Sequence, residues 1–445
     1  MPPPLPLFRA GATILAAALT LSAAAETFAQ TPEERVWDMD FTPAAQEERS
    51  PFWTAHAAFF DALCRQNAEA YARFSTLAEK VETHDAQRAM WKTAVAALKG
   101  EKWTAFWAFR DLYKKSLVAA QNGQTRYLGL CMAALSTVPS GYRTVLDIFG
   151  FEYDLQKGIE LLESDRDDFL PLERQAMLFY CHKNLTRNFD KAARALQGLE
   201  NYAVGRYVAV SFAMDVLKDP RRAQELLSRP TRGFPYLDYQ AGRAALYRGD
   251  YSEAVEKFNA FAGVCKGVYH ADARFKAGLA ALCAGWDAKA HFAAATNDAA
   301  VFDEDRYAQK QARRYLSEPP APDEIRLLKA RLFFDGGYLQ AALDELKDVK
   351  ATGDEATTEL HYRKGRIYQA MGKYDHALHH YSVAQRQFPE RNLWMKVYSG
   401  FHMGQIYDER GQKEEARAEW RRCLQYDGYD YQNGLEQKVK AALGK

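Results

Sequence analysis

The feature that most constrains the fold of this chain is a pair of glycines and an alanine that recur at fixed spacing. Each copy has a glycine, a second glycine seven residues later and an alanine five residues after that. Four segments share the spacing: GRAALYRGDYSEA from Gly242, GLAALCAGWDAKA from Gly278, GRIYQAMGKYDHA from Gly365 and GQIYDERGQKEEA from Gly404. The steps of 36 residues from the first to the second copy and 39 from the third to the fourth indicate one supersecondary unit per repeat.

Other segments keep part of the spacing. Gly336 and Ala341 keep the second glycine and the alanine, and Gly100 and Ala105 keep the same five-residue step. The segment 187–192 keeps it without the glycine. We therefore expect the repeat to continue, in degenerate form, into the N-terminal half of the chain.

Each repeat position has a physical reason. A glycine inside a helix costs about 1 kcal/mol, which is tolerated where a bulky side chain of the paired helix lies against it. The second glycine is expected to end that helix in a left-handed cap, and the alanine to lie where the second helix crosses closely. A large ring follows the alanine by one helical turn in three copies, as Phe258, Tyr381 and Trp420. The pattern predicts paired antiparallel helices.

From about Phe234 onward this pattern resembles the tetratricopeptide repeat (TPR) family. The resemblance implies an all-α fold in which helical hairpins stack into a right-handed superhelical solenoid. Because such units bury their faces only against neighbours, the roughly three domains that a length of 445 residues suggests become one elongated array. We expect an N-terminal helical region with degenerate repeats over 52–232 and a C-terminal TPR array over 233–445.

A second resemblance covers the middle and the end of the chain. The segment 135–162, LSTVPSGYRTVLDIFGFEYDLQKGIELL, and the closing segment 428–443, GYDYQNGLEQKVKAAL, look like parts of the inclusion-body-clearance group of TPR proteins in eukaryotes. In that group the solenoid is a binding or adaptor protein with ties to lipid handling. The export signal expected below is a difference from that group, so its cytosolic roles are not carried over.

Residues 1–29 have the order of a secretory signal peptide. A single basic residue, Arg9, precedes an apolar run from Ala10 to Ala25, with small residues suited to cleavage after Ala25 or Ala29. Residues 30–51 are polar and contain prolines, so we expect an exposed lead-in. No later stretch approaches the apolar length of a membrane span. The chain is therefore expected to be exported, to the periplasm if bacterial or otherwise secreted.

The charge and the cysteines exclude further classes. Lys and Arg total 59 against 58 Asp and Glu, which lacks the basic excess of a nucleic-acid binder. The six cysteines are scattered singly among apolar helical residues without a CxxC motif, as buried free cysteines usually are. The nearest pair, Cys265 and Cys283, is expected to be too far apart in a helical hairpin to form a disulfide.

Catalytic and metal-binding patterns were weighed against surface roles. His376, His379 and His380 lie on neighbouring faces of one predicted helix, an arrangement that suits a metal, but no acid or cysteine completes a ligand set. No GxSxG or HExxH motif occurs, and no cysteine has a convincing histidine partner. We expect no catalytic residue, metal or cofactor.

The predicted binding site is the concave face that the first helix of each pair lines in TPR arrays. Four basic side chains with interleaved tyrosines would suit a peptide with an acidic end. Counting from the repeat glycines places these residues there: Tyr239, Arg243, Lys276, Tyr362, Arg363, Arg366, His402 and Gln405. The alternative is that they are ordinary exposed residues of charged helices.

Two functions are compatible with these features. The first is an exported, non-catalytic TPR protein that binds a protein or peptide partner as a scaffold, adaptor or assembly factor. The second is a carrier of an apolar or lipidic ligand in the N-terminal region. The rings that would line such a site are Trp91, Trp103, Phe106, Trp107 and Phe109. We expect these rings to pack the helices together instead, and a cavity among them would favour the carrier.

Overall fold

The described part of the chain is entirely helical. The computed structural model describes residues 30–40, 50–138, 140–229, 234–297 and 302–444. These residues form α-helices, with short 3-10 and π-helical segments and no strand. The prediction of an all-α fold is confirmed, and the predicted signal peptide lies outside the described residues.

The N-terminal half contains α2 and α4 to α14. Their bounds are α2 (Pro32–Trp37), α4 (Pro51–Arg65), α5 (Ala68–Ala78), α6 (Asp85–Leu98), α7 (Lys102–Gln121), α8 (Arg126–Leu135), α9 (Arg143–Ile148), α10 (Leu155–Ser164), α11 (Pro171–Tyr180), α12 (Phe189–Leu196), α13 (Ala203–Phe212) and α14 (Pro220–Ser228). A π-helical turn extends α11 over Cys181–Leu185 and α13 over Ala213–Leu217.

The C-terminal half contains α15 to α26. Their bounds are α15 (Pro235–Arg248), α16 (Tyr251–Val264), α17 (His270–Ala284), α18 (Lys289–Thr296), α19 (Asp303–Ser317), α20 (Pro322–Asp335), α21 (Leu339–Glu345), α22 (Gly353–Ala370), α23 (Tyr374–Arg386), α24 (Leu393–Glu409), α25 (Lys413–Cys423) and α26 (Gln432–Ala442).

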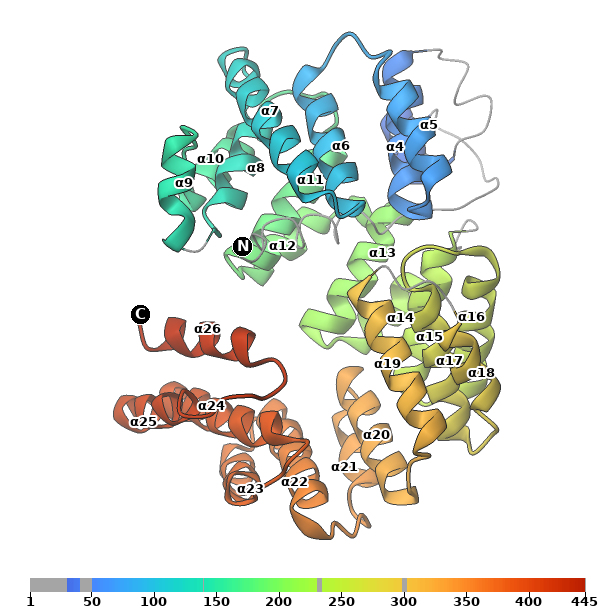
Figure 1. Cartoon of the computed structure of the whole chain (residues 1–445), viewed down its shortest axis with the longest axis vertical. Coiled ribbons are helices and arrows are strands. Elements are labelled where there is room, and N and C mark those ends of the chain that lie inside the picture. The colour runs from blue at the N-terminus through green and yellow to red at the C-terminus, as the bar shows by residue number, and fades with distance from the viewer. Residues whose placement is uncertain (1–29, 41–49, 139, 230–233, 298–301, 445) are drawn as a thin grey trace.

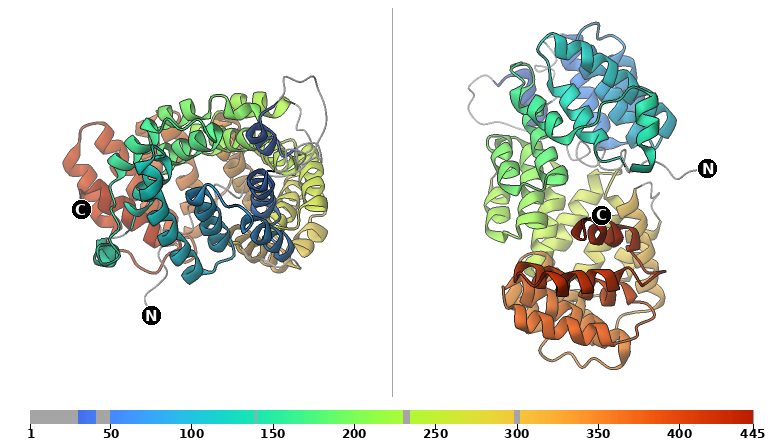
Figure 2. Two further views of the ribbon diagram at one scale, coloured as in Figure 1. Left: turned by 90° about the horizontal axis from the view of Figure 1, so that it is seen from above. Right: turned by 90° about the vertical axis from the view of Figure 1, so that its left-hand side faces the viewer.

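Helices that follow one another in the chain pack against one another. Hairpins form between α6 and α7, α15 and α16, α22 and α23, and α24 and α25. The first helices of different hairpins also touch: α15 contacts α17 and α20, α17 contacts α20, α20 contacts α22, and α22 contacts α24. The hairpins follow a curved path from one end of the molecule to the other (Figure 1), and the path is also evident in two perpendicular views (Figure 2).

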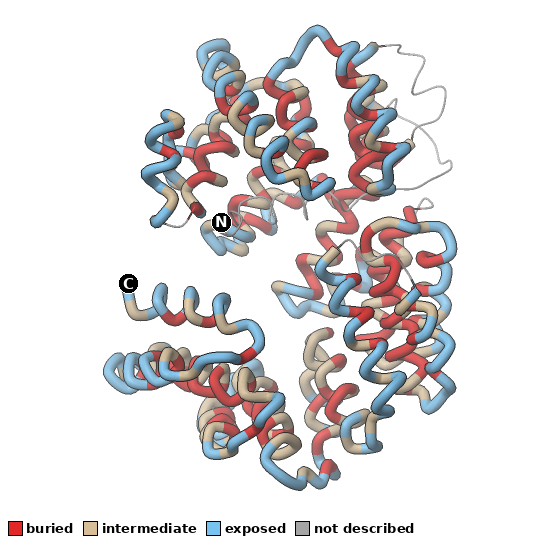
Figure 3. Tube along the Cα trace, viewed as in Figure 1, coloured by how far each residue is buried: buried red, intermediate tan, exposed pale blue. Residues whose placement is uncertain are grey.

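The apolar core follows the same path. One cluster of buried side chains extends from α2 to α20, and three smaller clusters follow between α20 and α22, α22 and α24, and α24 and α26. Buried positions face the neighbouring helices along the whole path (Figure 3). The largest cluster contains residues of both predicted regions, 52–232 and 233–445. A hydrogen bond also joins them: the hydroxyl of Tyr236 on α15 donates to the Cys64 carbonyl at the end of α4 (3.1 Å).

The repeat glycines are in contact with rings, as their spacing predicts. A Cβ on Gly365 would lie 2.6 Å from the ring of Tyr381, and one on Gly242 would lie 2.9 Å from that of Phe258. Gly404 meets Trp420 in the same way. The second glycine of each copy has a positive φ: 91° at Gly249, 77° at Gly285, 70° at Gly372 and 75° at Gly411.

Two predicted repeat positions are wrong by one or two residues. In the second copy the buried alanine follows the second glycine by three residues instead of five, so it is Ala288; Ala290 is exposed, and Phe292 packs on Gly278. In the α20–α21 hairpin the left-handed glycine is Gly337 (φ 84°) and the fully buried alanine is one residue after Ala341. Turn length is set by packing at each hairpin, which spacing alone does not reveal.

The expected exposed lead-in is wrong for its described beginning. Val36, Trp37 and Met39 are buried, and α2 packs against α4 and α13. Glu33 Oε1 accepts the backbone N–H of Glu173 near the start of α11 (2.9 Å). Asp38, which follows α2, accepts the N–H of the first residue of α13 (3.0 Å). The carboxylates of this segment thus cap two helices that have no cap of their own.

Carboxylates from other helices cap the C-terminal hairpins too. Asp305 of α19 accepts the backbone N–H of Asp272 in the first turn of α17 (2.9 Å). Glu355 of α22 accepts the N–H of Asn392 at the start of α24 (3.2 Å). Since buried N–H groups need acceptors, these contacts fix each helix start relative to a neighbouring helix.

Replacing Gly365 with alanine is expected to lower the free energy of unfolding by about 1–3 kcal/mol, because the new Cβ would overlap the buried ring of Tyr381. Gly434 in α26 is the matched control, since a Cβ there meets nothing within 4 Å. Gly434→Ala should stabilise the helix by up to about 1 kcal/mol. Urea unfolding of both variants measures the difference, and equal effects would contradict the close contact.

The Glu33 contact predicts a dependence of stability on pH. Burial raises the pKa of Glu33 from 4.5 to about 7, so the folded chain holds this proton more tightly than the unfolded chain. The free energy of unfolding should therefore fall as the pH rises from about 5 to 7 and change little above that range. Burial raises the pKa of Glu173 to about 7 as well.

Glu33→Gln keeps an oxygen acceptor and removes the titration. The loss of stability between pH 5 and pH 8 is expected to be smaller in this variant, by on the order of 1 kcal/mol or more, and smaller still in the E33Q/E173Q double variant. Urea unfolding at the two pH values measures it. An unchanged slope in the double variant would contradict the burial of these carboxyl groups.

Candidate partner-binding face

All eight residues predicted for the binding face lie on the first helices of hairpins. α15 carries Tyr239 and Arg243, α17 carries Lys276, α22 carries Tyr362, Arg363 and Arg366, and α24 carries His402 and Gln405. Since these helices form one connected layer, the residues are distributed over a shared surface. Their exposure and their partners, however, divide them into two groups.

The two tyrosines are buried, so their predicted contact with a partner is wrong. Tyr239 stacks on Tyr269 with ring centroids 4.9 Å apart, and its hydroxyl donates to Asp272 (2.5 Å). Tyr362 packs edge-on against Trp394 (5.5 Å). Both rings hold first helices together, because the large side chain fills the space between adjacent hairpins.

His402 is also enclosed. Burial lowers its pKa to about 3, so the ring is neutral near pH 7. Its Nδ1 lies 2.8 Å from Oε1 of Gln405, and the ring stacks on Tyr381 (5.5 Å). A neutral, buried imidazole does not supply a positive charge to a ligand, which corrects the predicted role of the His402 and Gln405 pair.

Three of the four predicted cations are neutralised within the fold. Arg243 holds both oxygens of Asp215 (2.6 and 3.3 Å), which the π-helical turn after α13 presents. Lys276 donates to Asp272, and Arg363 donates to Glu359. These three side chains have acidic partners already, so they contribute mainly to the stability of the layer.

Arg366 is different. Its guanidinium donates to the Tyr362 hydroxyl (3.0 Å) and lies over the ring of Phe334 (5.0 Å). Among the residues that the structure describes, no carboxylate lies within ion-pair distance of it. The rings fix the guanidinium in place and leave its charge available.

Two further cations lie near Arg366 and were missed by the sequence prediction. Arg331 on α20 approaches Asp335 only to 4.0 Å, and its Nε is buried without a hydrogen-bond acceptor in the described chain. Lys438 on α26 lies over the ring of Tyr398 (5.6 Å) and is likewise without an ion pair there.

A repeat signal for Arg331 exists. Arg243 and Arg366 each directly follow the first glycine of a repeat, and Arg331 follows Ala330, the residue at that position in the α20 hairpin. Because Ala330 replaces the first repeat glycine there, the glycine spacing did not identify Arg331 as the equivalent of Arg243 and Arg366. Lys438 has no such signal, because α26 follows the last hairpin.

Five basic residues lie on α15, α17, α20, α22 and α26, and we call them together the cationic face: Arg243, Lys276, Arg331, Arg366 and Lys438. Burial lowers the pKa of Lys276, and repulsion from Arg243 and Arg331 adds to the shift against the attraction of Asp272. Burial also lowers the pKa of Lys438, with repulsion from Arg187 and Arg366. Because Arg187 belongs to the α11–α12 connection, the N-terminal half approaches this face from the other side.

A fourth histidine, His361, joins the predicted histidine cluster, but the cluster does not form a metal site. His361 of α22 lies with its Nδ1 2.9 Å from Nδ1 of His380, and His379 is adjacent. The described residues contain no group of three or more histidines, cysteines or carboxylates placed to share a metal ion. The cysteines are free, so Cys265 and Cys283 are not joined.

The aromatic rings predicted to line a carrier site in the N-terminal region differ in their exposure to solvent. Trp91 is fully buried and packs against Phe52 (5.1 Å) and Phe59 (5.8 Å), as expected for a filled core. Trp103 and Trp107, in contrast, are exposed, so the prediction that all these rings pack between helices is wrong for this pair.

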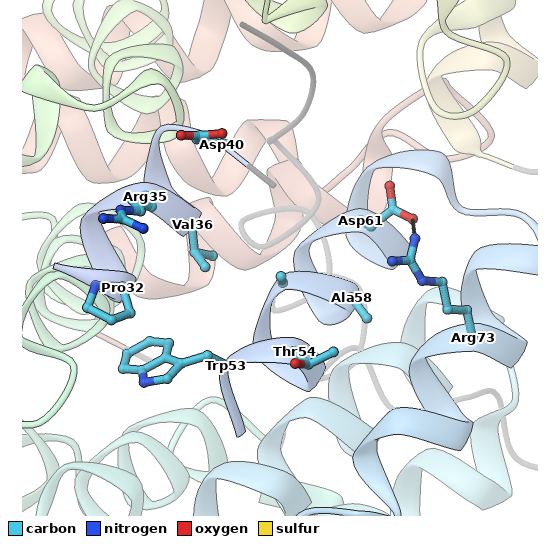
Figure 4. A pocket seen from close by; sticks show the side chains of 10 residues that line it. Pro32, Arg35, Val36, Asp40, Trp53, Thr54, Ala58, Asp61 and Arg73 are labelled. Atoms are coloured by element: carbon cyan, nitrogen blue, oxygen red, sulfur yellow. Dashed lines mark ion pairs between the residues drawn. The ribbon is translucent and has the colours of Figure 1, made fainter. Parts of the chain in front are cut away.

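A small pocket lies between α2 and α4 (Figure 4). Trp53 and Arg35 line it, as does the ion pair of Arg73 with Asp61 (3.8 Å). Its volume of about 50 Å³ holds one or two water molecules. Sites for drug-sized ligands measure roughly 300–1,000 Å³, so this pocket is too small for an acyl chain.

No protein-family model matches the chain, and no curated protein matches it in sequence. Within the described residues, no helix has the length and apolar character needed to cross a bilayer.

Stability measurements separate the paired cations from the free ones. Arg243→Gln is expected to lower the free energy of unfolding by about 1–2 kcal/mol, because the guanidinium loses its bonds to Asp215, Gln240 and Tyr247. Arg366→Gln should cost less than about 1 kcal/mol, because only ring contacts are lost. Equal losses on thermal unfolding would show that Arg366 is as structural as Arg243.

Proposed function

We propose that this chain is an exported TPR-like solenoid that binds an acidic segment of a protein partner on its cationic face. It would act as a scaffold, adaptor or assembly factor without catalysis or a cofactor. The single observation that carries the proposal is the group formed by Arg331, Arg366 and Lys438. In the described chain Arg366 and Lys438 have no carboxylate within ion-pair distance, and Arg331 reaches Asp335 only at 4.0 Å.

Grouping like charges disfavours the folded state unless something offsets the repulsion. Arg243 and Lys276 show the usual solution in this layer, an acid from a neighbouring turn or helix. Arg366 and Lys438 have no such acid, and Arg331 has only the long contact with Asp335 (4.0 Å), so an external anion is the simplest further counter-charge. Charge-assisted hydrogen bonds to carboxylates are about twice as strong as neutral ones, and a peptide with several acidic residues supplies them along an extended face.

Exposed rings beside the cations suit a peptide rather than a simple ion. Tyr307 of α19 and Tyr431, which precedes α26, are both exposed. Tyr431 packs on Trp394 (5.6 Å), and it lies close enough to Tyr307 to exchange a hydrogen bond with it. Tyrosine offers contact area at low conformational cost, so the face combines charge with apolar contact.

The TPR-like character of the solenoid rests on the glycine–ring contacts and on the connected layer of first helices. Export is inferred from the residue order in 1–29, which has the pattern of a signal peptide. The carrier alternative is less favoured, because the Trp91 cluster is tightly packed and the pocket near it is small.

A labelled oligoglutamate peptide tests the proposal directly. The protein without residues 1–29 is expected to raise the fluorescence anisotropy of this peptide, and the affinity should fall steeply with added salt. An R331Q/R366Q/K438Q variant should bind at least about tenfold more weakly. R417Q is the matched control, since Arg417 lies exposed on α25 in a pair with Glu414.

A labelled oligolysine peptide should not bind. The proposal fails if the unaltered protein does not bind oligoglutamate at low salt, or if the triple variant binds it as well as R417Q does.

A further inference from the structure

An apolar patch lies exposed on α7 and α9, far from the cationic face in the chain. Trp103 is 77% exposed, Trp107 is 51% exposed and Ile148 is 76% exposed. Val145 of α9 is exposed beside Ile148. Soluble proteins seldom leave several large apolar side chains together in water without a binding role.

Ring contacts join the two helices into one surface. Phe149, which follows α9, lies with its ring 5.1 Å from Phe106 and 6.1 Å from Trp107. We call the combined surface the tryptophan patch and define it by Trp103, Phe106, Trp107, Val145, Ile148 and Phe149. It is continuous across the helix contact because Phe149 bridges the two elements.

The tryptophans are not displaced core residues. The buried side of α7 consists of other residues: Ala105, Leu112, Tyr113 and Ser116. Trp103 and Trp107 are one turn apart and face away from that side. The helix therefore has two apolar sides, of which the fold uses one.

Basic residues surround the patch without acidic partners. Among the described residues no carboxylate forms an ion pair with Lys102, Arg110, Lys114 or Arg143. Two nearby acids are already paired: Glu101 with Lys99, and Asp111 with Lys115 (2.8 Å). A third, Asp147, accepts from the Tyr153 hydroxyl (3.1 Å). The rim of the patch is thus positive.

Arg110 lies within the patch. Its guanidinium is 5.7 Å from the ring centroids of both Trp107 and Phe149. Its Nε is buried and has no hydrogen-bond acceptor in the described chain, and no carboxylate there pairs with its charge. The charge of the guanidinium is therefore left without a counter-ion at the patch.

We propose that the tryptophan patch docks the protein on a membrane surface that contains anionic lipids. Trp103, Trp107 and Ile148 enter the boundary between headgroups and acyl chains, where tryptophan is enriched in membrane proteins. Lys102, Lys114 and Arg110 contact lipid phosphates. An apolar group with a basic rim is the pattern of interfacial binding, in which insertion and attraction to anionic lipid act together.

This inference does not depend on the proposed function. The cationic face belongs to α15–α26 and the tryptophan patch to α7–α9, so one protein can hold a peptide and a membrane surface at the same time. The occupant is a lipid surface rather than another protein, because the free cations and the exposed indoles occur on the same face.

Sedimentation with vesicles tests the proposal. The protein without residues 1–29 is expected to sediment with vesicles of phosphatidylglycerol and phosphatidylcholine, and to remain in solution with phosphatidylcholine alone. W103S/W107S should lower the partition coefficient at least about tenfold. K102E/K114E should remove the preference for phosphatidylglycerol. W286S is the matched control, since Trp286 is also exposed but lies in the turn between α17 and α18.

Two further measurements keep the test specific. W103S/W107S should keep its thermal unfolding temperature and its oligoglutamate binding, which separates a docking defect from misfolding. R331Q/R366Q/K438Q should keep its vesicle binding, which excludes a contribution from the cationic face. The proposal is overturned if the unaltered protein ignores phosphatidylglycerol, if W103S/W107S sediments like W286S, or if the double variant only dissociates a dimer on analytical ultracentrifugation.

Discussion

The contact of an aromatic ring with a glycine in the facing helix is the constraint on which the C-terminal half depends. Phe258, Tyr381 and Trp420 press on glycines of the first helices, so the two axes of each hairpin come closer than side chains would otherwise allow. The close approach fixes which side of the first helix faces its partner. The residue after the glycine then points about 100° away from that side, and in two of the four copies it is an arginine, Arg243 or Arg366.

The sequence predicted what depends on spacing within one hairpin. The residues that make the ring contacts and the left-handed glycines recur at fixed steps, so the sequence alone identifies them. Contacts between helices that are distant in the chain have no recognisable pattern in the sequence. The acid that neutralises Arg243 lies 28 residues earlier, and the N–H group that Glu33 caps lies 140 residues later. The predicted residues therefore lie on the expected helices, but the prediction was wrong about the exposure of Tyr239 and Tyr362 and about which charges remain free.

A net charge of +1 conceals two separate basic regions. The carboxylates lie largely in caps and in ion pairs between neighbouring turns, as Asp305 and Asp272 show. Consequently the unpaired cations gather where first helices adjoin α26 and where α7 meets α9. Local pairing, rather than total charge, decides what each surface can bind. Both proposals depend on that local imbalance.

The segment around α2 has a consequence for the order of folding. Most contacts in this chain join neighbours, which favours fast, local assembly. The two caps from Glu33 and Asp38 instead close loops of 140 and 165 residues. As the chain is synthesised, α2 emerges before α11 and α13 and has to wait for them. A reciprocal cap between Thr31 and Glu34 favours its helical state, but a helix of six residues is not stable alone, so the earliest segment of the described chain is among the last to dock.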